Sequence, residues 1–194
     1  SHWMNDFGLL GERPGAEIRA DSLSVRLFST LLERNLPLSL DEAVELHGGQ
    51  KARVGRVLER FRATGMVERV PRTDRLNTAL WTAMTAQHQR RGEDWMLKKG
   101  GFQRILSDSQ QTKLLASLKK GALSIEDVAK HLNGVEARDQ MLLLNLLGGR
   151  LPMGYRMSGT TAAGVLRQVQ DRLERVLRRM VRVAGLLDDA LAAK

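Results

Sequence analysis

The last fifth of the chain carries the pattern that most restricts its fold. Between Thr160 and about Leu191 there is no proline, and apolar residues recur at alternating intervals of three and four. This spacing places an apolar stripe along one side of a helix and, over almost four heptads, is typical of a coiled coil. We therefore predict a long helix over 159–194. Its stripe consists of Leu166, Val169, Leu173, Val176, Met180, Val183 and Leu187.

A lone helix of this kind would expose its stripe to water, so the stripe requires an apolar partner. Pairing with a second copy of the chain predicts a homodimer held by this helix. Packing of the helix against the chain's own domains is the alternative, and the sequence leaves both open. The stripe has no tryptophan or phenylalanine of the kind that anchors a helix on a membrane surface.

Composition excludes several classes of protein. The chain has 194 residues, which allows one domain or two small ones, and it has no cysteine for disulfides or thiolate chemistry. Aromatic residues make up 4% of the chain, which disfavours single-strand binding by base stacking. It contains no apolar run of membrane-spanning length and no recognisable signal peptide, so we expect a cytoplasmic protein without membrane contact.

The net charge of +9 comes mainly from arginine, which supplies 23 of the 31 basic residues. This balance indicates a phosphate-rich partner and a nucleoid-associated location, although arginine also follows genomic base composition.

The first 85 residues divide into a tail and a run of short elements. Residues 1–4 resemble an expression-tag remnant, and 5–20 are expected to form a flexible arm. A first helix follows Ser22, a second follows the capping box of Ser39 and Glu42, and a third spans 50–64 before Gly65. Residues 66–70 and 76–82 are expected to be strands around a turn at 71–75.

This order of three helices and a hairpin, over roughly 22–85, resembles the winged helix-turn-helix family. The resemblance implies a mainly α fold with a small β-hairpin wing over 21–85, a third helix that enters the DNA major groove, and a wing that touches the backbone or the minor groove. The DNA-binding residues would be Lys51, Arg53, Arg56 and Arg60 on the helix 50–64 and Arg69, Arg72 and Arg75 on the wing.

Charge is concentrated on the same segment. Residues 50–75 hold eight basic and three acidic residues, and arginine binds phosphate or guanine through two parallel hydrogen bonds. The alternative is a solvated helix face whose arginines pair with Glu59 and Glu68. The arginines on the outer faces of 159–194 likewise either widen a DNA-binding surface or keep that helix soluble.

The segment from Leu38 to Val44 is echoed 85 residues later, from Leu123 to Ala129. This repeat predicts a second, degenerate winged-helix-like unit over 107–158, with 151–157 as its short wing; chance similarity of two capped helices is the alternative. Its third helix, 135–147, is apolar nearly all round, which favours a protein partner over DNA. Residues 86–106 are expected to be a linker, in which basic clusters flank Trp95 and either touch nucleic acid or form a solvated hinge.

The sequence offers no catalytic or metal-binding constellation. His47, His88 and His131 lack ligand spacing, and neither of the common phosphate-binding glycine loops occurs. We therefore expect no enzyme, no cofactor and no metal. The leading expectation is a dimeric double-stranded DNA-binding protein similar to bacterial transcriptional regulators of the MarR or PadR families. The alternatives are a tandem winged-helix protein of plasmid replication or partition, a chromosome-condensation subunit acting mainly through protein contacts, and a pure interaction scaffold.

Overall fold

The computed structural model describes residues 19–192, so the expected tag and most of the expected arm lie outside the described residues. The chain forms two compact units. Unit 1 combines the residues up to Val70 with those from Gly154 onward, and unit 2 is the continuous segment Pro71–Met153. This division differs from the expected domains at 21–85 and 107–158, because one unit is inserted into the other.

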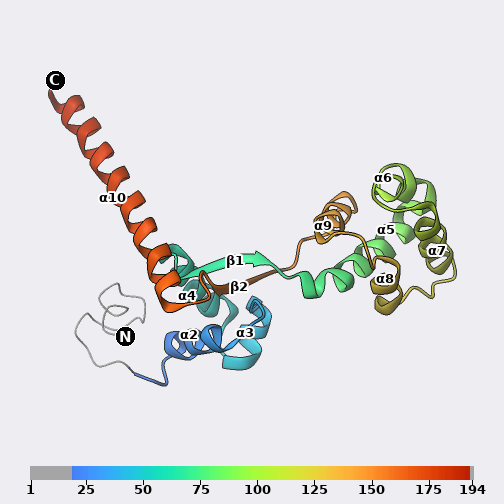
Figure 1. Cartoon of the computed structure of the whole chain (residues 1–194), viewed down its shortest axis with the longest axis horizontal. Coiled ribbons are helices and arrows are strands. Elements are labelled where there is room, and N and C mark those ends of the chain that lie inside the picture. The colour runs from blue at the N-terminus through green and yellow to red at the C-terminus, as the bar shows by residue number, and fades with distance from the viewer. Residues whose placement is uncertain (1–18, 193–194) are drawn as a thin grey trace. The chain divides into compact units, whose positions relative to one another are not determined.

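Unit 1 begins with three helices, α2 (Leu23–Glu33), α3 (Leu40–His47) and α4 (Lys51–Thr64) (Figure 1). The predicted caps are confirmed: Ser22 accepts a hydrogen bond from the backbone of Val25, and Ser39 with Glu42 forms a complete capping box. α4 ends at Gly65, whose φ of 86° lies in the left-handed region that favours glycine. Three of the predicted helices are therefore present close to their expected bounds.

The sheet is formed by two strands that are far apart in the sequence. β1 (Val67–Pro71) pairs antiparallel with β2 (Met153–Met157), and Leu38 forms an isolated antiparallel bridge to Tyr155. The prediction of a strand at 76–82 is wrong. Leu76, Leu80 and Met84 recur at helical spacing and are buried together, so this segment is the beginning of a helix.

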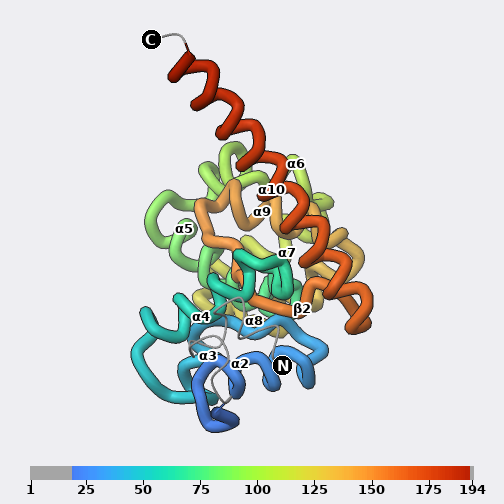
Figure 2. The backbone as a smooth tube through the Cα atoms, turned by 90° about the vertical axis from the view of Figure 1, so that its left-hand side faces the viewer, coloured from blue at the N-terminus to red at the C-terminus, as the bar shows by residue number. Residues whose placement is uncertain are grey.

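The helix α10 (Ala162–Ala192) confirms the predicted C-terminal helix, and it packs against α4 at its N-terminal end (Figures 1 and 2). Val165 and Val169 are buried in the core of unit 1. Every described residue of α10 after Val169 is exposed. Nearly three quarters of the helix thus has no apolar cover within its own unit.

The core of unit 1 joins residues from both of its segments. Leu27, Leu58 and Phe61 from the first segment are buried with Tyr155 and Val169 from the second. Folding of unit 1 therefore requires both segments, although the whole of unit 2 separates them in the sequence.

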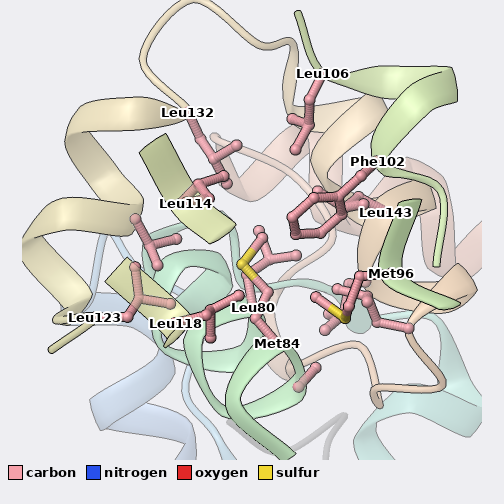
Figure 3. Close-up of a cluster of buried hydrophobic side chains, with 14 of the residues drawn as sticks. Leu80, Met84, Met96, Phe102, Leu106, Leu114, Leu118, Leu123, Leu132 and Leu143 are labelled. Carbon is pink, nitrogen blue, oxygen red and sulfur yellow. The ribbon is translucent and has the colours of Figure 1, made fainter. Parts of the chain in front are cut away.

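Unit 2 is helical. It contains the 3-10 turn η1 (Thr73–Arg75) and the helices α5 (Leu76–Lys98), α6 (Phe102–Ile105), α7 (Asp108–Lys119), α8 (Ile125–His131) and α9 (Ala137–Leu146). Gly92, with a φ of 75°, kinks α5. Figure 3 shows the core, where Leu80 and Met84 meet Met96, Phe102 and Leu114. The expected linker at 86–106 is therefore wrong, because Met96, Phe102 and Leu106 are buried core residues.

The predicted repeat is visible in the order of elements. At an offset of 85, α2 corresponds to α7, α3 to α8, α4 to α9 and β1 to β2, and both short helices begin with a capping box. The two copies differ at the strands. β2 pairs with β1 and does not form a wing of its own. In the first copy Leu38 pairs with Tyr155, whereas in the second copy the backbone carbonyl of the equivalent Leu123 accepts a hydrogen bond from the Trp81 indole.

Candidate nucleic-acid interface

A basic groove lies between the start of α2 and the outer face of α4. Its volume is about 610 Å³. Its ionisable side chains are mostly basic, and Asp21 is the one acidic residue among them. The basic residues are five arginines and one histidine: Arg19, Arg26, Arg53, Arg56, Arg60 and His47. Because the groove is open and cationic, it suits a polyanion better than an apolar ligand.

The α4 wall of this groove is a stripe of arginines beside the buried face of the helix. Arg53, Arg56 and Arg60 are exposed, and at about 100° per residue they fall within an arc of about 60°. Val57 and Phe61, on the adjoining arc, are buried in the core of unit 1. The apolar face therefore fixes the rotation of α4 and turns the arginine stripe to solvent.

Contacts on another side of α4 connect the helix to β2. Glu59 accepts hydrogen bonds from Arg62 (2.6 Å) and from the Tyr155 hydroxyl (2.8 Å). Burial opposes ionisation of Glu59, yet these two hydrogen bonds, together with the charges of Arg62 and Arg69, hold the pKa of Glu59 below its usual value. The only anionic residue on α4 is thus engaged by Arg62 and Tyr155.

The α2 wall of the groove is ordered by local contacts. Arg19 donates to Asp21 at 3.1 Å, and this hydrogen bond lowers the pKa of Asp21. The ring of His47 lies 2.9 Å from the Thr30 hydroxyl. Burial, together with the positive charge of Arg26, lowers the pKa of His47, so this side is cationic through its arginines and not through the histidine.

The structure brings together only three of the seven predicted DNA-binding residues, Arg53, Arg56 and Arg60. Lys51 forms an ion pair with Asp41 on a different side of α4. Arg69 is exposed on β1 and does not line the groove.

Two of the three expected wing arginines, Arg72 and Arg75, belong to unit 2. Arg72 is 3% exposed and donates two hydrogen bonds to Asp74, which lowers the pKa of that carboxyl. Arg75 ends η1 and lies 3.7 Å from the same carboxylate. The placement of Arg72 on a DNA-contacting wing is therefore wrong: the turn that was expected to form the wing is the beginning of unit 2.

Sequence reasoning missed Arg19, Arg26 and His47 as groove residues. The position of Arg26, four residues after the cap Ser22, predicts only an exposed site on the first turns of α2. No periodicity within one helix reports which face of another helix lies beside it. These residues become interpretable only when the packing of α2 and α4 is known.

The apolar residues of α9 serve the core of unit 2. Leu143, Leu144 and Leu147 are buried, and the helix packs against α5 and α6. Among the described residues of unit 2, Leu151 is the one large apolar side chain that is exposed. The apolar composition that suggested a protein partner therefore reflects internal packing.

The predicted dimerisation stripe is mostly exposed. Leu166, Leu173, Val176, Met180, Val183 and Leu187 are exposed in the single chain. Val169 differs from them, since it is only 6% exposed and belongs to the core of unit 1. The alternative in which the whole stripe packs against the chain's own units thus holds for the first two turns of α10 alone.

Within residues 19–192 there is no group of three histidine or acidic side chains arranged to hold a metal ion. None of the described helices combines the length and the apolarity that crossing a membrane requires. No family model, no curated protein and no solved structure matches the chain.

Proposed function

We propose that this protein binds double-stranded DNA and inserts α4 into the major groove. The observation that carries the proposal is the basic groove, in which the arginines of α4 face Arg26 of α2, and Arg19 just before that helix, across an open channel. An α-helix fits the major groove, and arginine side chains bind both phosphate oxygens and guanine edges there. Arg19 and Arg26, on the opposite wall, would then contact the DNA backbone.

Unit 1 is proposed to be a winged helix-turn-helix domain whose wing is interrupted. Three helices followed by two antiparallel strands give the order expected of that family. In place of a short tip between the strands, unit 2 is inserted. The backbone N–H of Arg72 donates to the carbonyl of Pro152 at 2.8 Å, which brings the two ends of the insertion together.

The proposed role is a dimeric, non-enzymatic transcriptional regulator of the cytoplasm, associated with the nucleoid. The exposed stripe of α10 supplies the dimerisation surface in this proposal. Two copies of α4 would then read two half-sites separated by one or more turns of the duplex, about 34–36 Å per turn.

A tandem winged-helix protein of plasmid replication or partition, or a chromosome-condensation subunit, is the second candidate. The correspondence of α7, α8 and α9 with α2, α3 and α4 favours it. Action mainly through protein contacts at unit 2 has less support, because the apolar residues of α9 are committed to the core. In either version, α4 remains the proposed DNA-contacting helix.

The test is the affinity for a random-sequence duplex at about 50 mM salt, measured by fluorescence anisotropy. At this salt each phosphate contact contributes roughly tenfold to the binding constant. Arg53→Gln/Arg56→Gln should therefore weaken binding by about a hundredfold for each chain bound to the duplex. The control is Arg175→Gln/Arg182→Gln on α10, which removes the same charge outside the groove and should change affinity by less than about threefold. Equal losses in both variants, or no binding by the wild type, would reject the proposal.

A further inference from the structure

The apolar face that α10 leaves exposed shares Leu166, Leu173, Met180 and Leu187 with the stripe predicted from the sequence, but its other positions lie on the side of the helix away from Val169. Val165 and Val169 turn into the core of unit 1 and cannot face a second chain. Beginning at Leu166, the positions 166, 170, 173, 177, 180, 184, 187 and 191 again alternate intervals of four and three, and all are exposed. Six of these eight residues are leucine or methionine and the other two are Gln170 and Ala184, so this column is a heptad seam with one polar position.

A second apolar surface adjoins the first residue of this seam. A groove of about 640 Å³ lies between the end of α2 and the start of α10, and Phe28, Leu32 and Leu166 contribute to its lining. Leu32 is 59% exposed and Leu166 is 51% exposed. The apolar surface of unit 1 is therefore continuous from this groove along α10.

We infer that two copies of α10 pair antiparallel along this seam, and that the C-terminal end of each helix reaches the α2–α10 groove of the other copy. This inference rests on the proposed dimer and specifies its geometry. In this register Leu177 lies beside Met180 of the second copy, Leu173 beside Ala184, and Leu166 beside Leu191. Antiparallel coiled coils alternate the two core positions of the heptad in this way.

The flanking residues favour the antiparallel direction over the parallel one. With antiparallel helices, Arg167 lies at the level of Asp188 of the second copy, and Val176 lies at the level of Val183. With parallel helices, Asp188 would face Val183 and Arg167 would have no opposite charge across the seam, whereas Glu174 faces a valine in either direction. Opposite charges that flank a coiled-coil seam determine helix direction.

Antiparallel pairing also covers the apolar surface at both ends of the helix. The apolar side chains near the C-terminus of α10, such as Leu187 and Leu191, then lie over the groove beside Leu166 and Leu32. Parallel helices would bring two C-terminal ends together and leave both grooves without these residues. A second copy is thus the occupant that matches the groove in chemistry and in position.

The length of the seam sets the distance between the two places where α10 joins unit 1. Leu166 and Leu191 are 25 residues apart, or about 37 Å along a helix that rises 1.5 Å per residue. In the antiparallel pair, the two copies of Leu166, and the starts of α10 that join unit 1, are therefore separated by about 37 Å along the helix axis. Half-sites read in successive major grooves are about 34–36 Å apart.

Engineered disulfides test the direction of the helices, since the chain has no cysteine of its own. Leu173→Cys/Ala184→Cys, after oxidation, should run as a covalent dimer on a denaturing gel without reductant, and each single variant should run as a monomer. Cross-linking within one chain is excluded because the two positions lie about 16 Å apart along the helix. Leu173→Cys/Arg182→Cys, whose second position lies on the outer face, is the control and should give little dimer.

Covalent dimer in either single variant would mean parallel helices and overturn the inference. Absence of cross-linking in the double variant would overturn it as well, provided that circular dichroism shows unchanged helicity. Leu166→Cys/Leu191→Cys, which samples the groove end of the seam, should cross-link too. A mass of 21.7 kDa for the wild-type protein in solution, which is the mass of one chain, would reject the dimer itself. Loss of DNA binding in a cross-linked dimer would reject only the proposed function.

The groove has an independent test with a matched control. Leu32→Arg places a charge where the second copy's C-terminal leucines are expected and should weaken dimerisation by about tenfold or more in sedimentation equilibrium. Leu46→Arg on α3 starts from a similar exposure, 57%, outside the groove, and should leave dimerisation unchanged. Equal effects of the two variants would contradict seating of α10 in the groove.

Discussion

Tyr155→Phe tests whether the two segments of unit 1 form one folding unit. The Tyr155 hydroxyl donates to Glu59 Oε1 at 2.8 Å, so a residue that follows unit 2 in the sequence is connected to one that precedes it. Phenylalanine keeps the buried ring and removes only the hydroxyl. The variant therefore measures this one contact between β2 and α4.

The expected magnitude follows from the surroundings of Glu59. A hydrogen bond to a charged group stabilises a protein by roughly 1.5–3 kcal/mol. The side chain of Glu59 is 42% exposed and keeps its ion pair with Arg62, so water replaces part of the lost interaction. We expect a loss of about 1 kcal/mol in the free energy of unfolding of unit 1 at pH 7.

The sign of the pH dependence follows from the pKa of Glu59. Burial would raise this pKa, but the hydrogen bonds from Arg62 and Tyr155 leave it lowered. A carboxyl whose pKa is lowered on folding contributes stability that is present above its unfolded pKa, about 4.3, and is lost as the pH falls through the folded value. The difference between wild type and Tyr155→Phe should therefore shrink below about pH 4.

Amide hydrogen exchange resolved by peptide, in increasing urea, measures the unfolding free energy of α4 separately from that of unit 2. Tyr155 is the only tyrosine, so absorbance at about 295 nm reports its titration alone. Burial and the neighbouring Glu59 raise the pKa of Tyr155 above its usual value, and Glu59→Gln should move it back toward about 10. A Tyr155→Phe effect that is absent, or equal at pH 3 and pH 7, would refute this reasoning.

Three further predictions concern the interface and the insertion. Arg72→Met should cost unit 2 about 1–3 kcal/mol in urea unfolding and leave DNA affinity unchanged; reduced affinity would return Arg72 to the interface. Gly65→Ala should destabilise unit 1 by more than about 1 kcal/mol, because φ is 86° and the new Cβ would lie 3.1 Å from the Gln168 carbonyl. Gly55→Ala within α4 is its control and should stabilise by about 0.5–1 kcal/mol. Replacing 72–152 by Asn-Gly, a favoured hairpin turn, should leave α4 folded by hydrogen exchange and binding DNA; an unfolded product would contradict the insertion.

Local signals in the sequence predicted the helices well. The serine caps, Gly65 and the apolar spacing of α4 act within one turn of a helix and depend little on the rest of the chain. For the same reason the three arginines of α4 were predicted together, since their common arc follows from helical geometry alone.

The sequence predicted the strand pairing and the domain division poorly. The segment that most readily pairs with a strand is the one that follows it after a short turn, so the sequence suggested a local hairpin at 66–82. The actual partner, β2, lies some 80 residues later, and no local pattern reports such a distance. The same long-range packing buries Arg72 in its ion pair and Val169 in the core, so the sequence could not predict either role.

The central claim, that the arginine stripe of α4 contacts DNA, is tested most directly by the salt dependence of binding. The logarithm of the binding constant for a duplex falls linearly with the logarithm of the salt concentration, by about 0.9 per phosphate contact. For Arg53→Gln/Arg56→Gln we predict a slope shallower than that of the wild type by about 1.8 per bound chain if both arginines contact phosphate, and by about 0.9 if one contacts a base edge. A slope identical to that of the wild type, with Arg175→Gln/Arg182→Gln giving the shallower one, would contradict the account.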